Sequence, residues 1–227
     1  ISVAKLCRDV YLHTPNTDRL DIQGIHHFKA DRDYGCAYVS TETVYITIAG
    51  SDDLIDHMNN FKALFRANWH GISAHRGFVS AAKELEKAML KILADYPLHR
   101  LVFTGHSRGG AIALLLAVSA EIHFPLRRGS SCITFGQPRV SSARQLRLAY
   151  RYGEYIRVQN GADVVCRWPK LGYSHAGTSF YLRKSGGHEI DPGWISMFGD
   201  RAMSIFSRAR DHSISSYIQE LQKCVQH

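Results

Sequence analysis

Residues 105–110 have the sequence Gly105-His106-Ser107-Arg108-Gly109-Gly110 and lie between two apolar segments of different character. The preceding segment, 100–104, is short and rich in β-branched and aromatic residues, which predicts a buried strand. The following segment, 111–118, is rich in Ala and Leu and apolar on every face, which predicts a buried helix. A Gly-x-Ser-x-Gly sequence between such a strand and such a helix is typical of a nucleophile elbow.

The two outer glycines of this pattern fit a turn that is too crowded for a Cβ atom. Ser107 is then expected at the tip of the turn, where backbone N–H groups and the helix dipole favour developing negative charge. A simpler interpretation is a tight strand-to-helix turn with Ser107 as the helix N-cap. That interpretation explains Ser107 and Gly109 but not Gly105, and we therefore favour the elbow.

The rest of the chain predicts an α/β fold. Helices are expected at 1–13, 78–96, 146–150 and 212–225, and further strands at 34–39, 43–49, 132–135 and 155–158. Strands that alternate with helices after residue 78 indicate a mostly parallel central sheet with helices on both faces, and the early strand pair adds an antiparallel portion. Because no repeat or linker is evident, the chain of 227 residues is predicted to form one domain, 1–227.

Composition excludes several classes of protein. Hydrophobic residues make up 45% and charged residues 21% of the chain, as in ordinary globular proteins. No apolar stretch has the length of a membrane span. The net charge of +8 suits a solvated surface or attraction to anionic membranes, and no nucleic-acid-binding motif accompanies it. The chain begins at Ile1 without a leader-like segment, so secreted and intracellular locations both stay open.

The five cysteines form no Cys-x-x-Cys pair and no metal-ligand set, and we expect neither a metal ion nor an organic cofactor. Cys36 and Cys132 lie in strand-like segments and are predicted to be small buried hydrophobic residues. Cys7 and Cys224 lie in the two terminal helices, where a disulfide and two reduced thiols are equally consistent with the sequence.

A serine nucleophile needs a general base and an orienting carboxylate. In an elbow architecture their order along the chain is Ser, acid, His. Asp163 fits the acid, because it follows the strand predicted at 155–158 and a short turn. Asp191 and Asp200 compete with it, but each lies in an irregular segment with no predicted strand before it.

The base is predicted to be His212, which lies between an irregular segment and the last helix. His175 and His188 are weaker candidates, because each leaves less chain for the connecting loop. The oxyanion hole is expected to combine the backbone N–H of Arg108 with a donor from Ser51, at the end of the early strand. Ser51 can also cap a helix that begins at 52–53.

Taken together, these residues make the chain resemble the class 3 lipase family, the fungal-type triacylglycerol lipases with their esterase and phospholipase relatives. The resemblance runs from about residue 34 to the C-terminus. The matching positions are 49–51, Asp56, 60–61, 75–78, 104–111, 134–140, 160–165, 172–178 and 211–212. The resemblance implies an α/β-hydrolase fold, a Ser107–Asp163–His212 triad and an oxyanion hole at Ser51 and Arg108.

The same resemblance implies structural rather than catalytic roles for five further residues: His75, Gln137, Pro138, Tyr173 and His175. The chain also departs from the family pattern. Arg108 stands where Leu is usual, which places a charged side chain beside the site. Ala49 stands where Arg is common, so an ion pair is expected to be missing there. The cysteine pattern of the fungal members is only partly matched.

Apolar side chains recur at roughly helical spacing before residue 75. They are Leu54, Ile55, Met58, Phe61, Leu64, Phe65 and Trp69. In class 3 lipases this region contains the lid helix, so a movable lid is expected within 52–74. The alternative is a helix packed permanently on the core.

A second apolar segment, 194–206, is interrupted by arginine and suits either an anionic membrane surface or ordinary packing of the loop before His212.

The sequence therefore predicts a serine carboxylic-ester hydrolase that acts on acyl lipids, like a triacylglycerol lipase, through an acyl-enzyme. Phospholipase A1 and short-chain carboxylesterase are the alternatives within the enzymes. A catalytically silent lipid-binding or interaction protein is the alternative outside them. The expected partners are an acyl-lipid substrate and, transiently, a membrane or lipid–water interface. Nucleic acid is not expected, and the oligomeric state is left open.

Overall fold

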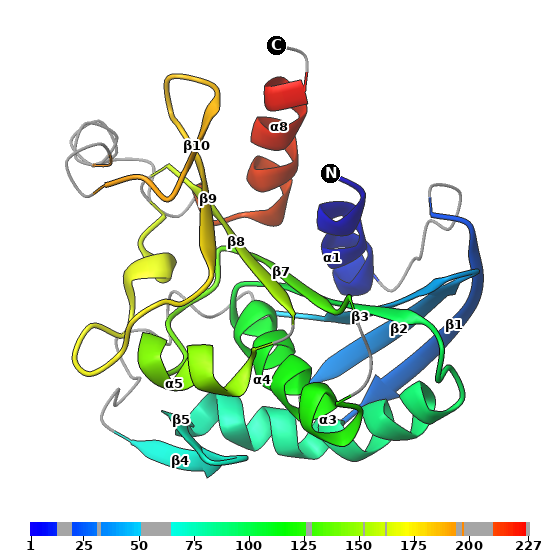
Figure 1. Cartoon of the computed structure of the whole chain (residues 1–227). Helices are drawn as coiled ribbons and strands as arrows, with labels where there is room; N and C mark the ends of the chain where they lie inside the picture. Colours follow the sequence, from blue (N-terminus) through cyan, green and yellow to red (C-terminus); the bar gives the residue numbers. More distant parts are fainter. Residues whose placement is uncertain are drawn as a thin grey trace.

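An eight-stranded sheet forms the centre of the computed structural model (Figure 1), with the strand order β1-β2-β3-β6-β7-β8-β9-β10. The strands are Ile22–Lys29 (β1), Tyr34–Ser40 (β2), Thr43–Ile48 (β3), Arg100–His106 (β6), Ser131–Phe135 (β7), Glu154–Asn160 (β8), Thr178–Leu182 (β9) and His188–Ile190 (β10). Neighbouring strands from β3 to β9 run parallel. At one edge, β1 pairs antiparallel with β2, and β2 with β3. At the other edge, β10 pairs antiparallel with β9.

The structure describes residues 1–12, 20–30, 33–50, 65–125, 129–151, 153–161, 163–193, 197 and 211–225.

Helices cover both faces of the sheet (Figure 1). One face carries Arg76–Ala94 (α3), Arg108–His123 (α4) and Ala143–Ala149 (α5), and the other carries Ser2–Leu12 (α1) and Ile214–Val225 (α8). A two-stranded hairpin of Arg66–Trp69 (β4) and Ile72–His75 (β5) packs against α3. The mostly parallel sheet, the helices on both faces and the early antiparallel pair confirm the predicted fold class. In the described part of the chain, no helix is long and apolar enough to cross a membrane.

The composition of α4 and α3 follows from where they lie. Every residue from 109 to 120 in α4 is buried, because this helix is enclosed by the sheet and α3, and it therefore needs no polar face. Helix α3 buries only one side, including Phe78, Leu85, Met89 and Leu93, and leaves the other side to solvent. These two helices and strands β3 and β6 supply most of the main hydrophobic core.

Four features are not predicted by the sequence patterns: β1, the β4–β5 hairpin, β9 and β10. Strand β1 has no clean alternation, since only Phe28 is fully buried in it. The helix predicted from the apolar spacing is wrong at Trp69, because this residue lies in β4. Its indole N–H donates to the Leu115 carbonyl oxygen at 2.8 Å. Trp69 is thus anchored in the core rather than carried by a lid. The other lid residues up to Leu64 lie outside the described residues, and Phe65 is exposed.

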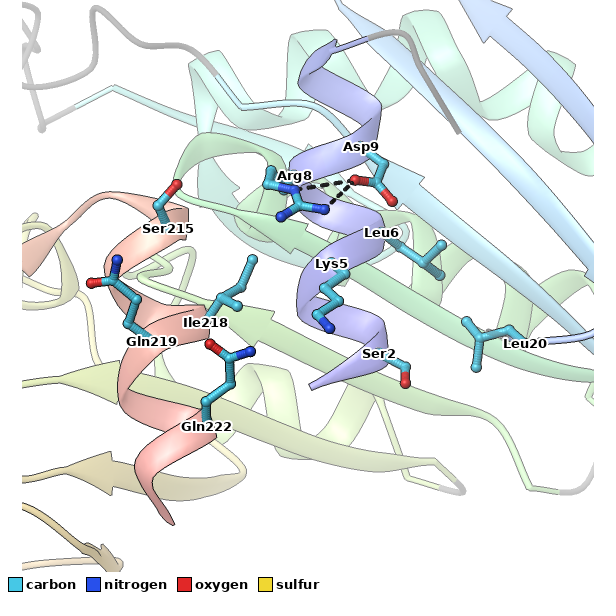
Figure 2. Close-up of a pocket in the computed structure, with 10 residues that line it drawn as sticks. All are labelled: Ser2, Lys5, Leu6, Arg8, Asp9, Leu20, Ser215, Ile218, Gln219 and Gln222. Atoms are coloured by element: carbon cyan, nitrogen blue, oxygen red, sulfur yellow. Dashed lines mark hydrogen bonds and ion pairs between the residues drawn. The ribbon is translucent and has the colours of Figure 1, made fainter. Parts of the chain in front are cut away.

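The two terminal helices pack against each other and enclose a hollow of about 350 Å³, lined by residues that include Lys5, Arg8 and Gln219 (Figure 2). Cys7 and Cys224 are free thiols, so the alternative of a disulfide between these helices is not realised. The Cys7 thiol lies 3.2 Å from the Thr104 hydroxyl oxygen, and burial raises its pKa to about 12. Cys36 and Cys132 are buried, as predicted.

The turn between β6 and α4 has the crowding that its glycines require. Ser107 adopts φ 58° and ψ −130°, a backbone conformation that non-glycine residues rarely occupy. A Cβ atom on Gly105 would lie closer than 3.0 Å to backbone atoms of Gly109, and one on Gly109 closer than 3.0 Å to backbone atoms of Ile48 and Ala49. The first turn of α4 therefore crosses the ends of β6 and β3 at a distance that only glycine permits.

We expect Gly105→Ala to lower the free energy of unfolding by about 3 kcal/mol, because the new methyl group meets backbone atoms that have nowhere to move. Gly24→Ala is the matched control, since its Cβ would make only an ordinary contact, 3.7 Å from the Val39 Cβ. Urea denaturation of both variants measures the difference. Equal stability of the two variants would contradict this account of the turn.

Candidate active site

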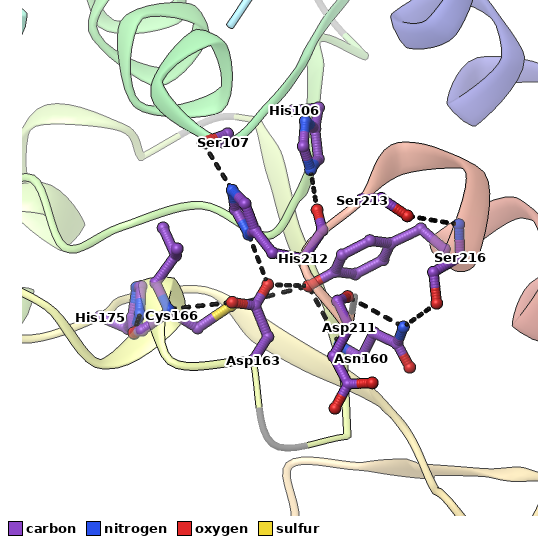
Figure 3. A network of polar contacts seen from close by, with 12 residues as sticks. His106, Ser107, Asn160, Asp163, Cys166, His175, Asp211, His212, Ser213 and Ser216 are labelled. Carbon is purple, nitrogen blue, oxygen red and sulfur yellow. Dashed lines mark hydrogen bonds and ion pairs between the residues drawn. The ribbon is translucent and has the colours of Figure 1, made fainter. Parts of the chain in front are cut away.

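Three predicted residues meet at the carboxyl edge of the parallel strands, where ligands bind in open α/β sheets. Ser107 follows β6, Asp163 follows β8, and His212 precedes α8. The His212 Nε2 atom lies 2.8 Å from the Ser107 Oγ, and its Nδ1 lies 2.9 Å from the Asp163 Oδ2 (Figure 3). All three residues are buried. The structure thus brings together a hydroxyl, an imidazole and a carboxylate in the geometry of a serine triad.

The hydrogen bonds assign the His212 tautomer. A carboxylate only accepts hydrogen bonds, so Nδ1 donates to Asp163 and Nε2 is left to accept from the Ser107 hydroxyl. The Ser107 side chain makes no capping hydrogen bond to α4. Ser107 thus occupies the N-cap position of α4, but its hydroxyl is directed to His212 and does not cap the helix.

Asp163 is held as a carboxylate by three hydrogen bonds. Its Oδ2 also accepts from the Tyr217 hydroxyl at 2.7 Å, and its Oδ1 accepts from the Val165 backbone N–H at 2.9 Å. Burial alone would raise the pKa of Asp163, but the nearby His212 and these hydrogen bonds lower it below its ordinary value. Burial raises the pKa of Tyr217 well above its ordinary value, so its hydroxyl remains a donor.

The sequence pattern does not predict the hydrogen bond from Tyr217 to Asp163. The signal that was available is the place of Tyr217 in the C-terminal helix, five residues after His212 and on the buried side.

A second histidine, His106, hydrogen-bonds to the backbone of His212. The His106 Nε2 donates to the His212 carbonyl oxygen at 2.5 Å, and the two rings are 4.7 Å apart. The His106 Nδ1 lies 3.0 Å from the Tyr11 hydroxyl, which donates to it from α1. Burial, with a smaller effect of His212, lowers the pKa of His106 to about 3, so this ring is neutral. The N-terminal helix is in this way joined to the candidate site.

The backbone before His212 is held from β8 and from the turn after β9. The Asn160 Nδ2 donates to the Asp211 carbonyl oxygen at 3.0 Å and to the Ser216 Oγ at 2.9 Å. The Lys184 ammonium group lies 2.6 Å from the Asp211 Oδ1. These contacts limit where the His212 backbone can lie relative to Asp163.

The competing candidates lie elsewhere. The Asp191 Oδ1 accepts the Ser179 backbone N–H at 2.6 Å, and the His188 ring stacks on Phe180. The His175 Nε2 donates to the Cys166 carbonyl oxygen at 2.6 Å. Asp200 lies outside the described residues.

Three of the residues expected to be structural make contacts of that kind. The His75 Nδ1 accepts the Gly77 backbone N–H at the start of α3, and burial lowers the pKa of His75 to about 4. The Gln137 Oε1 accepts a hydrogen bond from the Tyr155 hydroxyl at 3.0 Å. The Tyr173 ring lies 4.2 Å below the Arg66 guanidinium carbon.

Of the two expected oxyanion-hole residues, Arg108 lies within the described ranges and Ser51 does not. Arg108 is the first residue of α4, so its backbone N–H has no acceptor within the helix and is available to a ligand. Gly50 directly precedes Ser51, and a Cβ there would lie 2.6 Å from the His106 carbonyl oxygen, so the chain after β3 runs against the elbow.

The Arg108 side chain is neutralised. Its guanidinium forms a two-pronged ion pair with Asp33, just before β2, and one prong joins Nη2 to Oδ2 at 3.1 Å. The Asp33 side chain is 5% exposed and that of Arg108 20%. Ala49, where the sequence predicted a missing ion pair, donates its backbone N–H to the Tyr34 carbonyl oxygen at 2.9 Å.

Within the described ranges, no group of three His, Cys, Asp or Glu residues is placed to hold a metal ion. No member of the candidate triad lines the hollow between α1 and α8.

The family model described as Lipase (class 3) matches residues 45–173. The lipase of Rhizomucor miehei is 29% identical over 154 residues, which cover 63% of this chain and 42% of that protein. Phospholipase A1-II 1 of Oryza sativa subsp. indica is 37% identical over 92 residues, which cover 36% of this chain and 22% of that protein. The chain thus spans less than half the length of these curated relatives.

The fold is shared with solved structures. The structure of Rhizomucor miehei triacylglyceride lipase aligns with a TM-score of 0.73 at 19% sequence identity, over 92% of this chain and 90% of that chain.

The Arg108–Asp33 ion pair gives a stability prediction. We expect Asp33→Asn to lower the free energy of unfolding by about 2 kcal/mol, between the small value of a surface pair and the larger value of a buried one. Arg108→Leu should cost a similar amount, because it leaves the Asp33 carboxylate buried without its partner. The double variant should lose less than the sum of the two, which a double-mutant cycle by urea denaturation measures. Strictly additive losses would argue against the pair.

The buried neutral His106 gives a pH prediction. Its pKa is about 3 in the folded chain and about 6.5 in the unfolded chain. Between these pH values the unfolded chain binds more protons than the folded chain. The contribution of neutral His106 to the free energy of unfolding is therefore fully present above pH ~6.5 and is lost as the pH falls toward 3. From pH 7 to pH 5 this residue should account for a loss of about 2 kcal/mol.

His106→Gln should reduce that acid sensitivity, since the amide can still donate to the His212 carbonyl oxygen and never gains a proton. His27→Gln, at an exposed position, is the control. Denaturation curves at pH 7 and pH 5 measure the effect. If His106→Gln keeps the full loss between the two pH values, His106 is not the cause.

Proposed function

The chain belongs to the class 3 lipase family, and from this premise we propose that it is a serine carboxylic-ester hydrolase acting on acyl lipids. The observation that supports this best is the pair of hydrogen bonds that join Ser107, His212 and Asp163 at 2.8 and 2.9 Å. Three buried groups in that order have the geometry that nucleophilic catalysis by serine needs.

The proposed reaction follows the positions of these groups. His212 Nε2 takes the Ser107 hydroxyl proton while Oγ attacks the ester carbonyl carbon. Asp163 stabilises the imidazolium that forms. The backbone N–H of Arg108 and a donor at Ser51 stabilise the oxyanion. The imidazolium then protonates the leaving alcohol, and water, activated by the same imidazole, releases the fatty acid from the acyl-enzyme.

Triacylglycerol-like lipids are the proposed substrate class, with contact at a membrane or lipid–water interface. The similarity to Rhizomucor miehei lipase supports this class. A phospholipase A1 activity is a second candidate, favoured by the similarity to the rice protein of that name. The movable lid expected within 52–74 stays a proposal, and residues 52–64 of that range lie outside the described ranges.

The experiment uses the chain with Ser107→Ala, and with Ser80→Ala as a matched control at an exposed position of α3. A fluorophosphonate probe should label the wild type and Ser80→Ala and leave Ser107→Ala unlabelled. Hydrolysis of triacylglycerol emulsions, phospholipid vesicles and soluble short-chain esters should be lost in Ser107→Ala alone. The ranking of these substrates distinguishes a triacylglycerol lipase from a phospholipase A1 or a short-chain esterase.

Asp163→Asn should lower kcat by about 10⁴-fold, because an amide no longer stabilises the required His212 tautomer.

Unchanged hydrolysis in Ser107→Ala would refute the assignment of the nucleophile. A wild type that neither reacts with the probe nor hydrolyses any substrate would favour a silent lipid-binding protein instead.

A further inference from the structure

A cavity of about 250 Å³ adjoins the Asp163 carboxyl group. Its lining includes Cys166 and His175, which lie beside Asp163 and away from Asn160 and Asp211 in Figure 3. Ser107 and His212 do not line it. This cavity, which we call the arginine cavity, is therefore distinct from the place where an ester would meet the candidate nucleophile.

Three arginines line the arginine cavity: Arg139, Arg157 and Arg167. Arg157 lies in β8 and is only 8% exposed. Its Nε donates to the Ala176 carbonyl oxygen at 2.7 Å, and no ion pair joins it to a carboxylate within the described ranges. A buried arginine without a negative partner is rare in proteins, because desolvation of the charge is costly.

Arg139 brings a second positive charge to the same place. It donates from Nη1 to the Pro169 carbonyl oxygen at 3.4 Å, and its Nε is buried without a partner among the described residues. Burial and the charge of Arg157 lower the pKa of Arg139. Two guanidinium groups that repel each other across a cavity are the arrangement that an anion would stabilise.

The acidic residues of the lining do not supply that anion. Asp163 is engaged by His212, Tyr217 and the Val165 N–H. Asp191 is exposed, and its Oδ1 accepts the Ser179 backbone N–H. Burial, with a smaller effect of Arg157, lowers the pKa of His175 to about 3, so its ring is neutral. The described lining thus leaves the Arg139 and Arg157 charges without an ion-pair partner.

We propose that the arginine cavity binds a phosphate group, either as inorganic phosphate or at the end of a small phosphate ester. Guanidinium groups offer paired N–H donors that match phosphate oxygens. A volume of about 250 Å³ equals that of roughly eight water molecules, which leaves space for a glycerol-sized group beside the phosphate. Such a ligand would add negative charge near the Asp163 carboxylate without contacting Ser107.

The test measures binding of inorganic phosphate and of glycerol 3-phosphate by calorimetry, and the melting temperature with each, against chloride at equal ionic strength. We expect saturable binding to the wild type. Arg139→Gln and Arg157→Gln should each weaken it at least tenfold. Arg147→Gln, at an exposed position of α5, should bind as the wild type does. Arg139 is only half-buried, so Arg139→Gln is expected to fold. It therefore still tests the site if the more buried variant Arg157→Gln fails to fold.

Ser107→Ala should bind phosphate with unchanged affinity, which separates this result from the proposed hydrolysis. Tighter binding of glycerol 3-phosphate assigns the site to a phosphate ester such as a lipid headgroup, and equal binding assigns it to free phosphate. Either result supports the cavity as the site. Equal stabilisation by chloride, or equal binding by Arg139→Gln, Arg157→Gln and Arg147→Gln, would overturn the proposal.

Discussion

The close crossing of α4 over the ends of β3 and β6 is the constraint on which the site depends. Gly105 and Gly109 have no space for a Cβ atom, and this contact brings the helix N-terminus to the carboxyl edge of the sheet. Ser107 is held at a positive φ as a result, with its hydroxyl directed at His212 rather than at the helix. Strain at this one residue is maintained because buried packing on every side determines the turn.

The two ends of the chain converge on that turn. Tyr217 in α8 donates to Asp163, and Tyr11 in α1 donates to His106, which in turn holds the His212 backbone. Each of these hydrogen bonds restrains the imidazole or its carboxylate partner. The packing of α1 against α8 is therefore coupled to the alignment of the candidate triad, although neither helix contains a triad residue.

Charge around the site is arranged in local pairs. The Arg108 guanidinium is matched by Asp33, and the Lys184 ammonium group by Asp211. The arginine cavity is different, because the described residues provide no carboxylate pair for Arg139 and Arg157. The same edge of the sheet thus combines a neutralised site at Ser107 with a positively charged cavity behind Asp163.

The sequence by itself determined the elbow, the order of Ser107, Asp163 and His212, and the parallel α/β sheet. These depend on short-range patterns: glycine spacing, apolar strands and the turns that follow them. It did not predict β1, whose burial pattern lacks alternation. Only the tertiary structure decided that Tyr217 donates to Asp163, that Tyr11 donates to His106 and that Asp33 pairs with Arg108. Those partners lie 54, 95 and 75 residues away along the chain, where no local pattern can indicate which side chains meet.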